Sequence, residues 1–598
     1  MSQTGLSSRR KRRENCSTRC LSRRQAWGDA RASWRKWQWK DVGRSYVRAQ
    51  SLRSLLNVIS GRISSGVVSG DILYNGVPRK KMMKRITAYC MQDDLLHSNL
   101  TVLQTFMFAA QLRLPEKMSF VEKERRVEEL LTDLRLQKCK HTIIGGHGSR
   151  GISGGERRRV SLGVELIADP SVVLLDEPTS GLDSATAKLI IDNLRKVSAS
   201  KTVICSIHQP SSELFFSFDQ VLVLHSGSSI YYGSPRAIMD YLSGIGFKSE
   251  LYWNPGDFIL SLCGQSTENS QRLISEWKVI SSKEDNVEAM VTESPLNIEE
   301  KFKTSWSMQF LVLLRRSFFL RKGSLITNVN LIRNIALAFV VGVVWFQMSL
   351  DEDSVELRLG MLSFTTTFWM ISPAFLSILL FPPERAVVIR ERASGTYRTS
   401  AYFFAKSLCE IPVGLLYPTI YVIITYWMTG MQANFGKFLL HLLVVYLLVM
   451  VAEGMGYAFS TAFRDISKAF SASTVVFILF MVIGGFYVPE SLIPSWMEWI
   501  VYLSPIKYSY LLLSKIEFSG VEFQCFGPSQ TSYPNMCSSA EQAFSGTEAL
   551  EAADVTGSTA VGIGVLFLFV LAYRTLAFIL FRRQTKPLAN YLISSILL

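Results

Sequence analysis

The sequence predicts an α/β domain followed by an all-α bundle of six membrane-spanning helices. A chain of 598 residues is too long for one ordinary domain, so two or more units with cores of their own are expected. Most charged residues precede Lys322, whereas the long apolar stretches follow it. Continuous apolar runs in the first half end in polar residues, which is typical of strands buried on both faces of a parallel sheet. These observations separate a soluble half from a membrane half.

Residues 1–50 hold most of the net charge, with 14 Lys or Arg against three acidic residues. This segment supplies +11 of the chain's +15, so the remaining residues carry only +4 and need no basic face for nucleic acid. We expect a solvated, disordered arm, with a patch for anionic lipid headgroups or an organelle transit peptide as the alternatives. The first residues contain no apolar stretch of signal-peptide length, which predicts a cytosolic soluble half.

Six apolar stretches have, or approach, the about 20 residues that a helix needs to span ~30 Å of hydrocarbon. They cover residues 325–346, 359–381, 408–430, 438–463, 469–488 and 558–581. Lys and Arg are frequent after the second, fourth and sixth stretches, while acidic residues follow the first. Because Lys and Arg are retained on the cytosolic side, both termini are expected in the cytosol, and residues 489–557 are expected to form one long external loop.

Cys525 and Cys537 lie in that external segment, an oxidising setting in which we expect them to form a disulfide. A bond to a partner subunit, or two free thiols, remain open. The other seven cysteines show no paired metal-binding spacing and are expected to be reduced thiols. Glu453 lies inside the fourth apolar stretch, where a carboxylate is costly, so it has either a functional role or a hydrogen-bonded structural one.

In the soluble half, the apolar run at residues 172–175 ends in Asp176 and Glu177, and the run at residues 202–207 ends in His208. Ligands of open α/β sheets bind at the carboxyl ends of strands, where two acids can hold Mg²⁺ and orient a water against a phosphate. These residues therefore predict a phosphate-handling edge of the sheet.

Ser153, Gly154 and Gly155 stand immediately before a helix-like stretch that stops at Asp169 and Pro170. Glycines let backbone N–H groups approach a ligand closely, and the unpaired donors of a helix N-terminus attract phosphate. This segment is predicted to bind an anion.

Three motifs follow one another in a family-specific order: ISGGERRR at residues 152–159, LLDEPTSGLD at residues 174–183 and IHQP at residues 207–210. They resemble the signature loop, the Walker B and D-loop segment, and the switch histidine of the ATP-binding cassette (ABC) superfamily. The soluble-then-membrane order, with Asn254, Pro255, Asp257 and Phe258 before the linker, resembles its G-type, White-like half-transporters in particular.

The resemblance implies ATP and Mg²⁺ as cofactors and a P-loop NTPase-like domain. It assigns catalysis to Glu177 and His208, and Mg²⁺ to Asp176 with Gln92, which follows the strand-like residues 86–90. It assigns ATP contacts to Gln92, Ser153, Gly154, Gly155, Glu156 and Asp183. Residues 51–260 would form the nucleotide-binding domain, residues 261–324 a linker with a connecting helix, and residues 325–598 an ABC-2 type transmembrane domain.

The same resemblance implies a mechanism in which two subunits, as a homodimer or a heterodimer, sandwich two ATP molecules. The implied activity is ATP-driven export of a lipidic or amphipathic molecule across a bilayer by a multi-pass protein, with the plasma membrane as the expected location and no nucleic acid as partner. Phe486 and Tyr487 match the position of the family's hydrophobic valve, and ordinary packing is the alternative.

One departure from the family concerns the phosphate-cradling P-loop, Gly-x-x-x-x-Gly-Lys-Ser/Thr, which occurs nowhere in the sequence. Counting back from residues 55–57, which resemble the helix after a P-loop, Leu52 takes the lysine position and Arg53 the hydroxyl position. The nucleotide-binding domain is thus expected to be incomplete at its N-terminus. Either the chain is a true variant, or residues 1–50 are a misread gene start, which we favour. As written, the alternative function is a non-hydrolysing partner subunit.

Overall fold

The computed structural model describes residues 49–62, 72–74, 77–78, 85–146, 150–247, 254–284, 302–321, 328–525 and 543–585. Residues 1–48 of the predicted basic arm, which covers residues 1–50, lie outside this part of the chain, and residues 49–50 begin a helix. The chain divides into two compact units. In the described part, the first unit holds the residues up to Met308 with Arg390–Tyr397, and the second holds Gln309–Ile389 with Arg398–Thr585.

The first unit is built around a parallel sheet with the strand order β3-β4-β5. Its strands are β3 (Thr87–Cys90), β4 (Val172–Leu175) and β5 (Thr202–Cys205). The registers align Cys90 with Leu175 and Leu175 with Cys205, so all three strands end level with one another. The two runs predicted as strands are confirmed, although β5 ends two residues before the predicted end of its run.

Both faces of this sheet are covered, which explains why its central strand β4 is continuously apolar. Val173 and Leu175 pack into one core cluster, whereas Leu174 packs into another together with Leu55 and Leu56. Leu55 and Leu56 belong to α2 (Ala49–Ser60), which also packs on β6. The helix that was expected to follow a P-loop therefore covers one face of the sheet.

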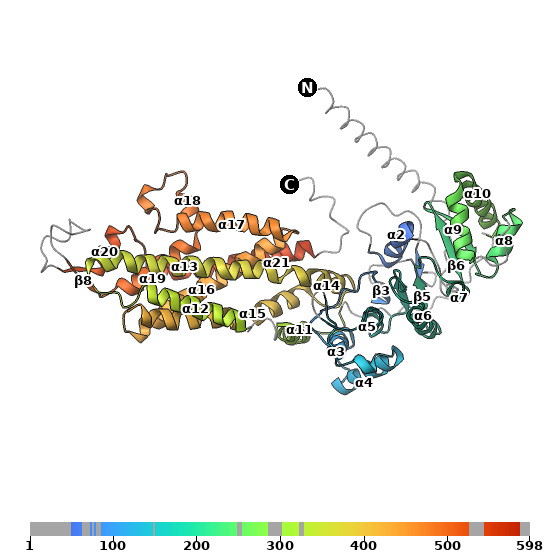
Figure 1. Cartoon of the computed structure of the whole chain (residues 1–598), viewed down its shortest axis with the longest axis horizontal. Coiled ribbons are helices and arrows are strands. Elements are labelled where there is room, and N and C mark those ends of the chain that lie inside the picture. The colour runs from blue at the N-terminus through green and yellow to red at the C-terminus, as the bar shows by residue number, and fades with distance from the viewer. Residues whose placement is uncertain are drawn as a thin grey trace, which may run out of the picture. The chain divides into compact units, whose positions relative to one another are not determined.

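The remaining elements of the first unit surround this core (Figure 1). Two antiparallel pairs are β1 (Leu73–Tyr74) with β2 (Val77–Pro78) and β6 (Val221–His225) with β7 (Ser228–Gly233). The helices are α3 (Val102–Arg113), α4 (Phe120–Asp133), η3 (Gln137–Cys139), α5 (Gly154–Leu166), α6 (Ser184–Ser198), α7 (Ser212–Phe216), α8 (Ile238–Gly244), α9 (Pro255–Gln265) and α10 (Thr267–Glu284).

The described cysteines of the first unit are buried or half-buried and form no disulfide, as predicted for reduced thiols. Burial raises the pKa of the Cys90 thiol to about 12 and that of the Cys139 thiol to about 11. A thiol with so high a pKa is almost entirely protonated at neutral pH, so it is a poor nucleophile and a poor metal ligand.

The second unit consists mainly of helices, and an antiparallel strand pair, β8 (Glu522–Gln524) with β9 (Ala543–Ser545), joins them. The helices that begin after residue 305 are α11 (Trp306–Arg321), α12 (Asn328–Val344), α13 (Glu352–Leu380), α14 (Pro382–Ala393), α15 (Thr399–Met428), α16 (Phe435–Ala462), α17 (Ile466–Val482), η4 (Glu490–Leu492), α18 (Glu498–Val501), α19 (Pro505–Phe518), α20 (Gly546–Ala552) and α21 (Thr559–Gln584). Packing is closest between α16 and both α13 and α21, and between α12 and α15 (Figure 1).

Four of these helices, α13, α15, α16 and α21, are long and apolar enough to cross a membrane. The first and fifth predicted stretches form shorter apolar helices, α12 and α17, of 17 residues each. At a rise of ~1.5 Å per residue these two are about 25 Å long, which is less than a typical hydrocarbon core. A helical membrane unit is confirmed, while the count of six spans stays a prediction.

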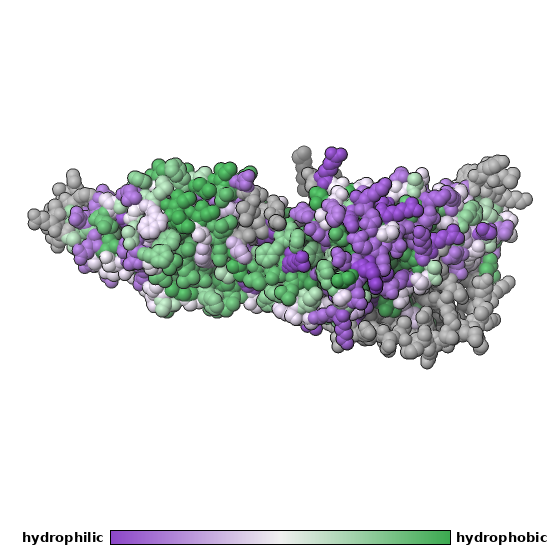
Figure 2. Space-filling view, turned by 90° about the horizontal axis from the view of Figure 1, so that it is seen from below, coloured by the Kyte–Doolittle hydropathy of each residue, from purple (hydrophilic) through white to green (hydrophobic). Residues whose placement is uncertain are grey.

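Many large apolar side chains on these helices face outward, including Phe339 and Val344 on α12 and Phe567 and Leu568 on α21. Figure 2 shows hydrophobic residues gathered over the helical unit and hydrophilic residues over the α/β unit. An apolar outer surface of this kind is stable in lipid rather than in water.

The fifth predicted stretch extended too far. It was expected to continue to residue 488, but α17 ends at Val482. Gly484 and Gly485 follow, and Gly485 has a φ of +94°, a conformation outside the helical region. A Cβ atom on Gly484 would lie 2.8 Å from Ile506 Cγ2, so the chain turns closely against α19 here.

The segment predicted as one long external loop, residues 489–557, contains folded elements, while its external location stays a prediction. It contains α19, which is buried along most of its length and packs on α13, α16 and α21. Scarcity of Lys and Arg indicates a side of the membrane and carries no information about secondary structure.

A buried ion pair fixes α19 to α13. Arg358 Nη1 donates to Glu517 Oε1 at 2.5 Å, and both side chains are almost fully buried. Arg358 also donates to the carbonyl oxygen of Met348 at 2.8 Å, and the amide of Gln432 donates to Glu517. Both carboxylate oxygens and both terminal nitrogens of the pair are therefore used, while Arg358 Nε has no partner in the described part of the chain. A buried charge pair is tolerated when most of its groups are bonded in this way.

Replacing Arg358 with Gln should lower the free energy of unfolding by about 3–5 kcal/mol, because Glu517 would be left as an uncompensated buried charge. Thermal unfolding of the detergent-solubilised protein measures the effect. Arg125→Gln is the control, since Arg125 is exposed and lies 3.9 Å from Glu129, where such pairs contribute little. The double variant Arg358→Met with Glu517→Leu should recover most of the loss, and equal melting of R358Q and R125Q would contradict the prediction.

Candidate functional site

The predicted catalytic residues meet at the carboxyl edge of the parallel sheet. Asp176 and Glu177 follow β4 directly, while Gln92 and His208 each stand a few residues beyond the ends of β3 and β5. Since the three strands end level, these side chains are brought to one edge although they are far apart in the sequence. Asp176 is buried, whereas Gln92 and His208 are exposed.

A chain of hydrogen bonds joins three of these residues. Gln92 Nε2 donates to Glu177 Oε2 at 2.9 Å, and the Glu177 amide donates to Ser206 Oγ at 2.9 Å. The Ser206 hydroxyl in turn donates to Asp176 Oδ1 at 2.9 Å. Glu177 has a φ of +45°, which is unfavourable for a side chain of its kind, and the Ser206 bond helps to hold this conformation.

Sequence reasoning missed Ser206. The residue ends the apolar run before His208 and carries the only hydroxyl between β5 and that histidine. One signal could have indicated Ser206. It is a small polar residue that directly follows its strand, as Asp176 directly follows the neighbouring strand.

The donor set at this edge suits Mg²⁺. This ion prefers oxygen ligands and usually keeps several water and phosphate ligands beside one or two carboxylates. The bond from Gln92 Nε2 to Glu177 leaves the Gln92 amide oxygen directed elsewhere, and Ser206 orients the Asp176 carboxylate. In the described part of the chain no three His, Cys, Asp or Glu side chains converge as a metal cage, so bound phosphates would have to complete the site.

The predicted signature residues form the first turn of α5. Ser153 is its N-cap: the Glu156 amide donates to Ser153 Oγ at 3.3 Å, and the Ser153 amide donates to Glu156 Oε2 at 2.9 Å. Burial opposes the ionisation of Glu156, but these bonds outweigh it and hold the pKa of its carboxyl below the usual value. This capping box fixes the helix start whose free N–H groups were predicted to bind an anion.

Gly155 and Asp183 lie close together. A Cβ atom on Gly155 would stand 2.5 Å from Thr186 Cγ2, so no larger residue fits there without a shift. Thr186 is in the first turn of α6, and its amide donates to the N-cap Asp183 at 3.1 Å. Two helix starts therefore meet, and Glu156 and Asp183 stand one on each.

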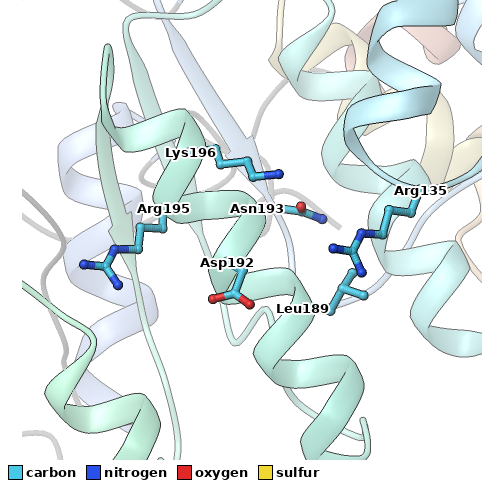
Figure 3. Close-up of a pocket in the computed structure, with 6 residues that line it drawn as sticks. All are labelled: Arg135, Leu189, Asp192, Asn193, Arg195 and Lys196. Carbon is cyan, nitrogen blue, oxygen red and sulfur yellow. The ribbon is translucent and has the colours of Figure 1, made fainter.

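A cavity of about 360 Å³ elsewhere in the first unit does not belong to this site. It lies between α6 and the turn after α4, and Figure 3 shows Asn193 and Lys196 directed toward Arg135 across it. None of the predicted site residues lines it.

The two positions expected in place of a P-loop, Leu52 and Arg53, fall within α2, and of the residues that would form the loop before them only 46–48 lie outside the described part. In the second unit, Phe486 and Tyr487 follow α17 with ring centroids 5.2 Å apart, and Phe486 stacks edge-on against Tyr510 at 6.1 Å. Both rings are partly exposed, so a gate role remains a prediction.

Glu453 has a partner inside the second unit. Arg574 Nη2, on α21, donates to Glu453 Oε2 on α16 at 2.7 Å. Arg321 pairs with Glu410 on α15 and also donates to Tyr457 on α16. These pairs favour the structural interpretation of Glu453 over a separate functional one.

An acid pair at the edge of a parallel sheet, a capped glycine-bearing helix start in the same unit, and a following unit of long apolar helices define a membrane-bound ATPase of the ABC transporter class. Residues 53–180 match the family model "ABC transporter", and residues 308–518 match "ABC-2 type transporter".

Similar proteins identify the particular family of ABC transporters. ABC transporter G family member 14 of Arabidopsis thaliana is 36% identical over 495 residues, covering 79% of this chain and 76% of the relative. Protein white of Drosophila melanogaster is 33% identical, over 89% and 80% of the two chains. The mouse broad substrate specificity ATP-binding cassette transporter ABCG2 is 32% identical, over 79% and 77%. The chain belongs to the G family of ABC transporters.

Membership establishes the general function. The chain is a subunit of an ATP-binding and ATP-hydrolysing export transporter and is an integral membrane protein. Half-transporters of this family generally work as dimers.

Cys525 is buried and disulfide-bonded, while Cys537 lies outside the described residues. Peptide mapping of surface-expressed protein under non-reducing conditions should recover Cys525 linked to Cys537, because both belong to the segment predicted to be external. Reduction before digestion is the control and should release two separate peptides. Recovery of Cys525 linked to a second chain, or of two free thiols, would contradict this pairing.

Proposed function

We propose that this chain, paired with a second half-transporter subunit, exports a lipidic or amphipathic small molecule across the plasma membrane. The observation that carries the proposal is the hydrogen-bonded edge of Gln92, Glu177, Ser206 and Asp176. An edge of this kind places a carboxylate where the water that attacks the γ-phosphate must be activated.

In this mechanism Glu177 orients that water and accepts its proton, and His208 contacts the γ-phosphate from the neighbouring strand. Asp176 and Gln92 would hold Mg²⁺, which neutralises charge on the phosphates when it is bound. Ser153, Gly154, Gly155 and Glu156 would contact the ATP held by the opposite subunit, with Asp183 beside them. The capped start of α5 supports this role, because its free N–H groups suit phosphate.

We propose that all six apolar helices cross the membrane and that both termini are cytosolic. For α12 and α17, thinning of the bilayer or flanking polar residues would accommodate the shorter length. The distribution of Lys and Arg between the segments supports the orientation. Phe486 and Tyr487 would then stand at the outer end of the fifth span, as an aromatic constriction above the substrate path.

For the first residues we propose a misread gene start in place of an authentic P-loop. The family match begins at residue 53, and α2 packs on the sheet as a helix after a P-loop would. We include the domain limits in this proposal: the nucleotide-binding domain covers residues 51–260, the linker residues 261–324 and the transmembrane domain residues 325–598. A transcript read across the region that encodes Gln50 and Ser51 separates this proposal from the alternative, a subunit that hydrolyses no ATP and lends its signature loop to an intact partner.

Replacing Glu177 with Gln, in a chain whose P-loop has been restored, should reduce ATP hydrolysis by about 10²–10⁴-fold. The amide cannot accept the proton of the attacking water, while ATP binding is retained. Phosphate release and retention of labelled ATP in the purified dimer measure both effects. Glu213→Gln is the matched control, because Glu213 is exposed and pairs only with Lys188 on the surface. Undiminished hydrolysis by the Glu177 variant would assign the base to another residue.

The chain as written should bind ATP weakly and transport nothing as a homodimer. A P-loop lysine gives charge-assisted hydrogen bonds to phosphate, about twice as strong as neutral ones, and Leu52 gives none. ATP-dependent uptake into inside-out vesicles compares this chain with a version carrying a restored P-loop. Robust uptake by the chain as written would show that other residues hold the nucleotide.

A further inference from the structure

Arg158 connects α5 to the catalytic edge of the same chain. Its Nη1 donates to the carbonyl oxygens of Met91 and Gln92, at 2.5 and 3.1 Å, and lies 3.0 Å from Asp94 Oδ1. Its Nη2 donates to the carbonyl oxygen of Asp176 at 2.6 Å. One guanidinium thus holds the main chain just beyond β3 and just beyond β4.

This arrangement suits arginine because the planar guanidinium presents several donors in fixed directions. The Arg158 side chain is only 8% exposed, and the ion pair with Asp94 compensates its charge. Without the guanidinium, three main-chain carbonyls at the catalytic edge would lose a donor, and for the buried Asp176 carbonyl this loss is costly. Arg158 therefore makes defined hydrogen bonds to particular main-chain groups and is not part of a solvated basic surface.

The neighbouring arginine makes a different set of contacts. Arg157 donates to the carbonyl oxygens of Ile144 and Gly145, at 3.2 and 3.0 Å, on another part of the first unit. Arg157 and Arg158 are adjacent in ISGGERRR but bond to different parts of the unit. Arg158 bonds to the main chain of Gln92 and Asp176.

Arg158 stands within the second turn of the helix that Ser153 caps. Five residues at ~1.5 Å per residue separate the two by about 7.5 Å along the axis, within one continuous hydrogen-bonded helix. A displacement of the main chain at Gln92 or Asp176 is therefore passed to the capped helix start as a movement of a rigid element.

We propose that Arg158 is a positioning residue that couples the two composite ATP sites of the dimer. The inference rests on the proposed function, in which the Gln92 and Asp176 edge of one chain serves one ATP and the Ser153 to Glu156 segment of that chain serves the other. Arg158 joins these two contributions within a single subunit. Closure of one site on ATP then moves the helix start that completes the second site.

Hydrogen exchange of the full-length chain in detergent, without nucleotide, tests the physical link. Arg158→Gln should speed exchange about tenfold or more in peptides that cover residues 91–95 and residues 173–178. The Asp176 amide, which donates to Cys90 O at 2.9 Å, is a direct reporter. Arg158→Lys should keep exchange slow at residues 91–95, because an ammonium can occupy the Nη1 position beside Asp94. It should still speed exchange at residues 173–178, because no donor then reaches the Asp176 carbonyl.

Arg157→Gln is the matched control, one position away on the same helix. It should speed exchange near residues 144–146 and leave the two catalytic-edge peptides unchanged. Unchanged exchange in Arg158→Gln, or the same catalytic-edge pattern in both glutamine variants, would overturn the link. The lysine variant distinguishes loss of particular contacts from general unfolding, which would speed exchange throughout.

A second measurement tests coupling between the sites. Two differently tagged subunits with restored P-loops are combined, one of them carrying Arg158→Gln, and retention of photoreactive ATP is measured on each subunit. Retention should fall on both subunits to a similar degree, whereas a fall confined to the variant subunit would overturn the coupling. Absence of retention in the unsubstituted dimer would instead contradict the proposed function and leave the exchange result standing.

Discussion

The catalytic edge depends on one constraint, the burial of the parallel sheet on both faces. Alternate residues of β4 enter two different cores, so no polar side chain can stand within the strand without leaving its hydrogen-bonding groups unsatisfied. The functional polar residues therefore follow the strand ends, and the registers make all three ends level. Hydrophobic packing thereby brings Gln92, Asp176 and Ser206 to one edge, where the hydrogen bond from Ser206 to Asp176 then fixes the carboxylate.

The sequence allowed much of this edge to be predicted, because acids after an apolar run follow directly from the period of a buried strand. Asp176, Glu177 and His208 were identified in this way. Ser206 and Arg158 were not, for a common reason. Arg158 bonds mainly to main-chain carbonyls, which every sequence possesses, and Ser206 acts through a main-chain amide as well as a carboxylate. Such contacts exist only once the chain is folded, so the main-chain partners of Arg158 cannot be read from residue types, and Ser206 can be found only from its level beside the acids of the neighbouring strand.

In the membrane unit, hydropathy located each apolar helix to within a few residues at most ends. It failed where local geometry or helix length decided the outcome. Gly484 and Gly485 end α17 early although the surrounding residues remain apolar. The 14-residue α19 is too short to register as a membrane span, and its burial depends on the Arg358 to Glu517 pair, whose members lie 159 positions apart. A search for spans detects lipid-facing length and overlooks short helices that face protein.

The pairing of Glu453 with Arg574 has a consequence for how the chain is made. The carboxylate on α16 is synthesised 121 residues before its arginine on α21, so the fourth apolar helix leaves the ribosome with a charge that has no permanent counterpart. An ionised side chain at the centre of a bilayer is costly until it is paired. We therefore expect α16 to insert less favourably by itself than after α21 has been made, so that its stable insertion depends on the C-terminal end of the chain.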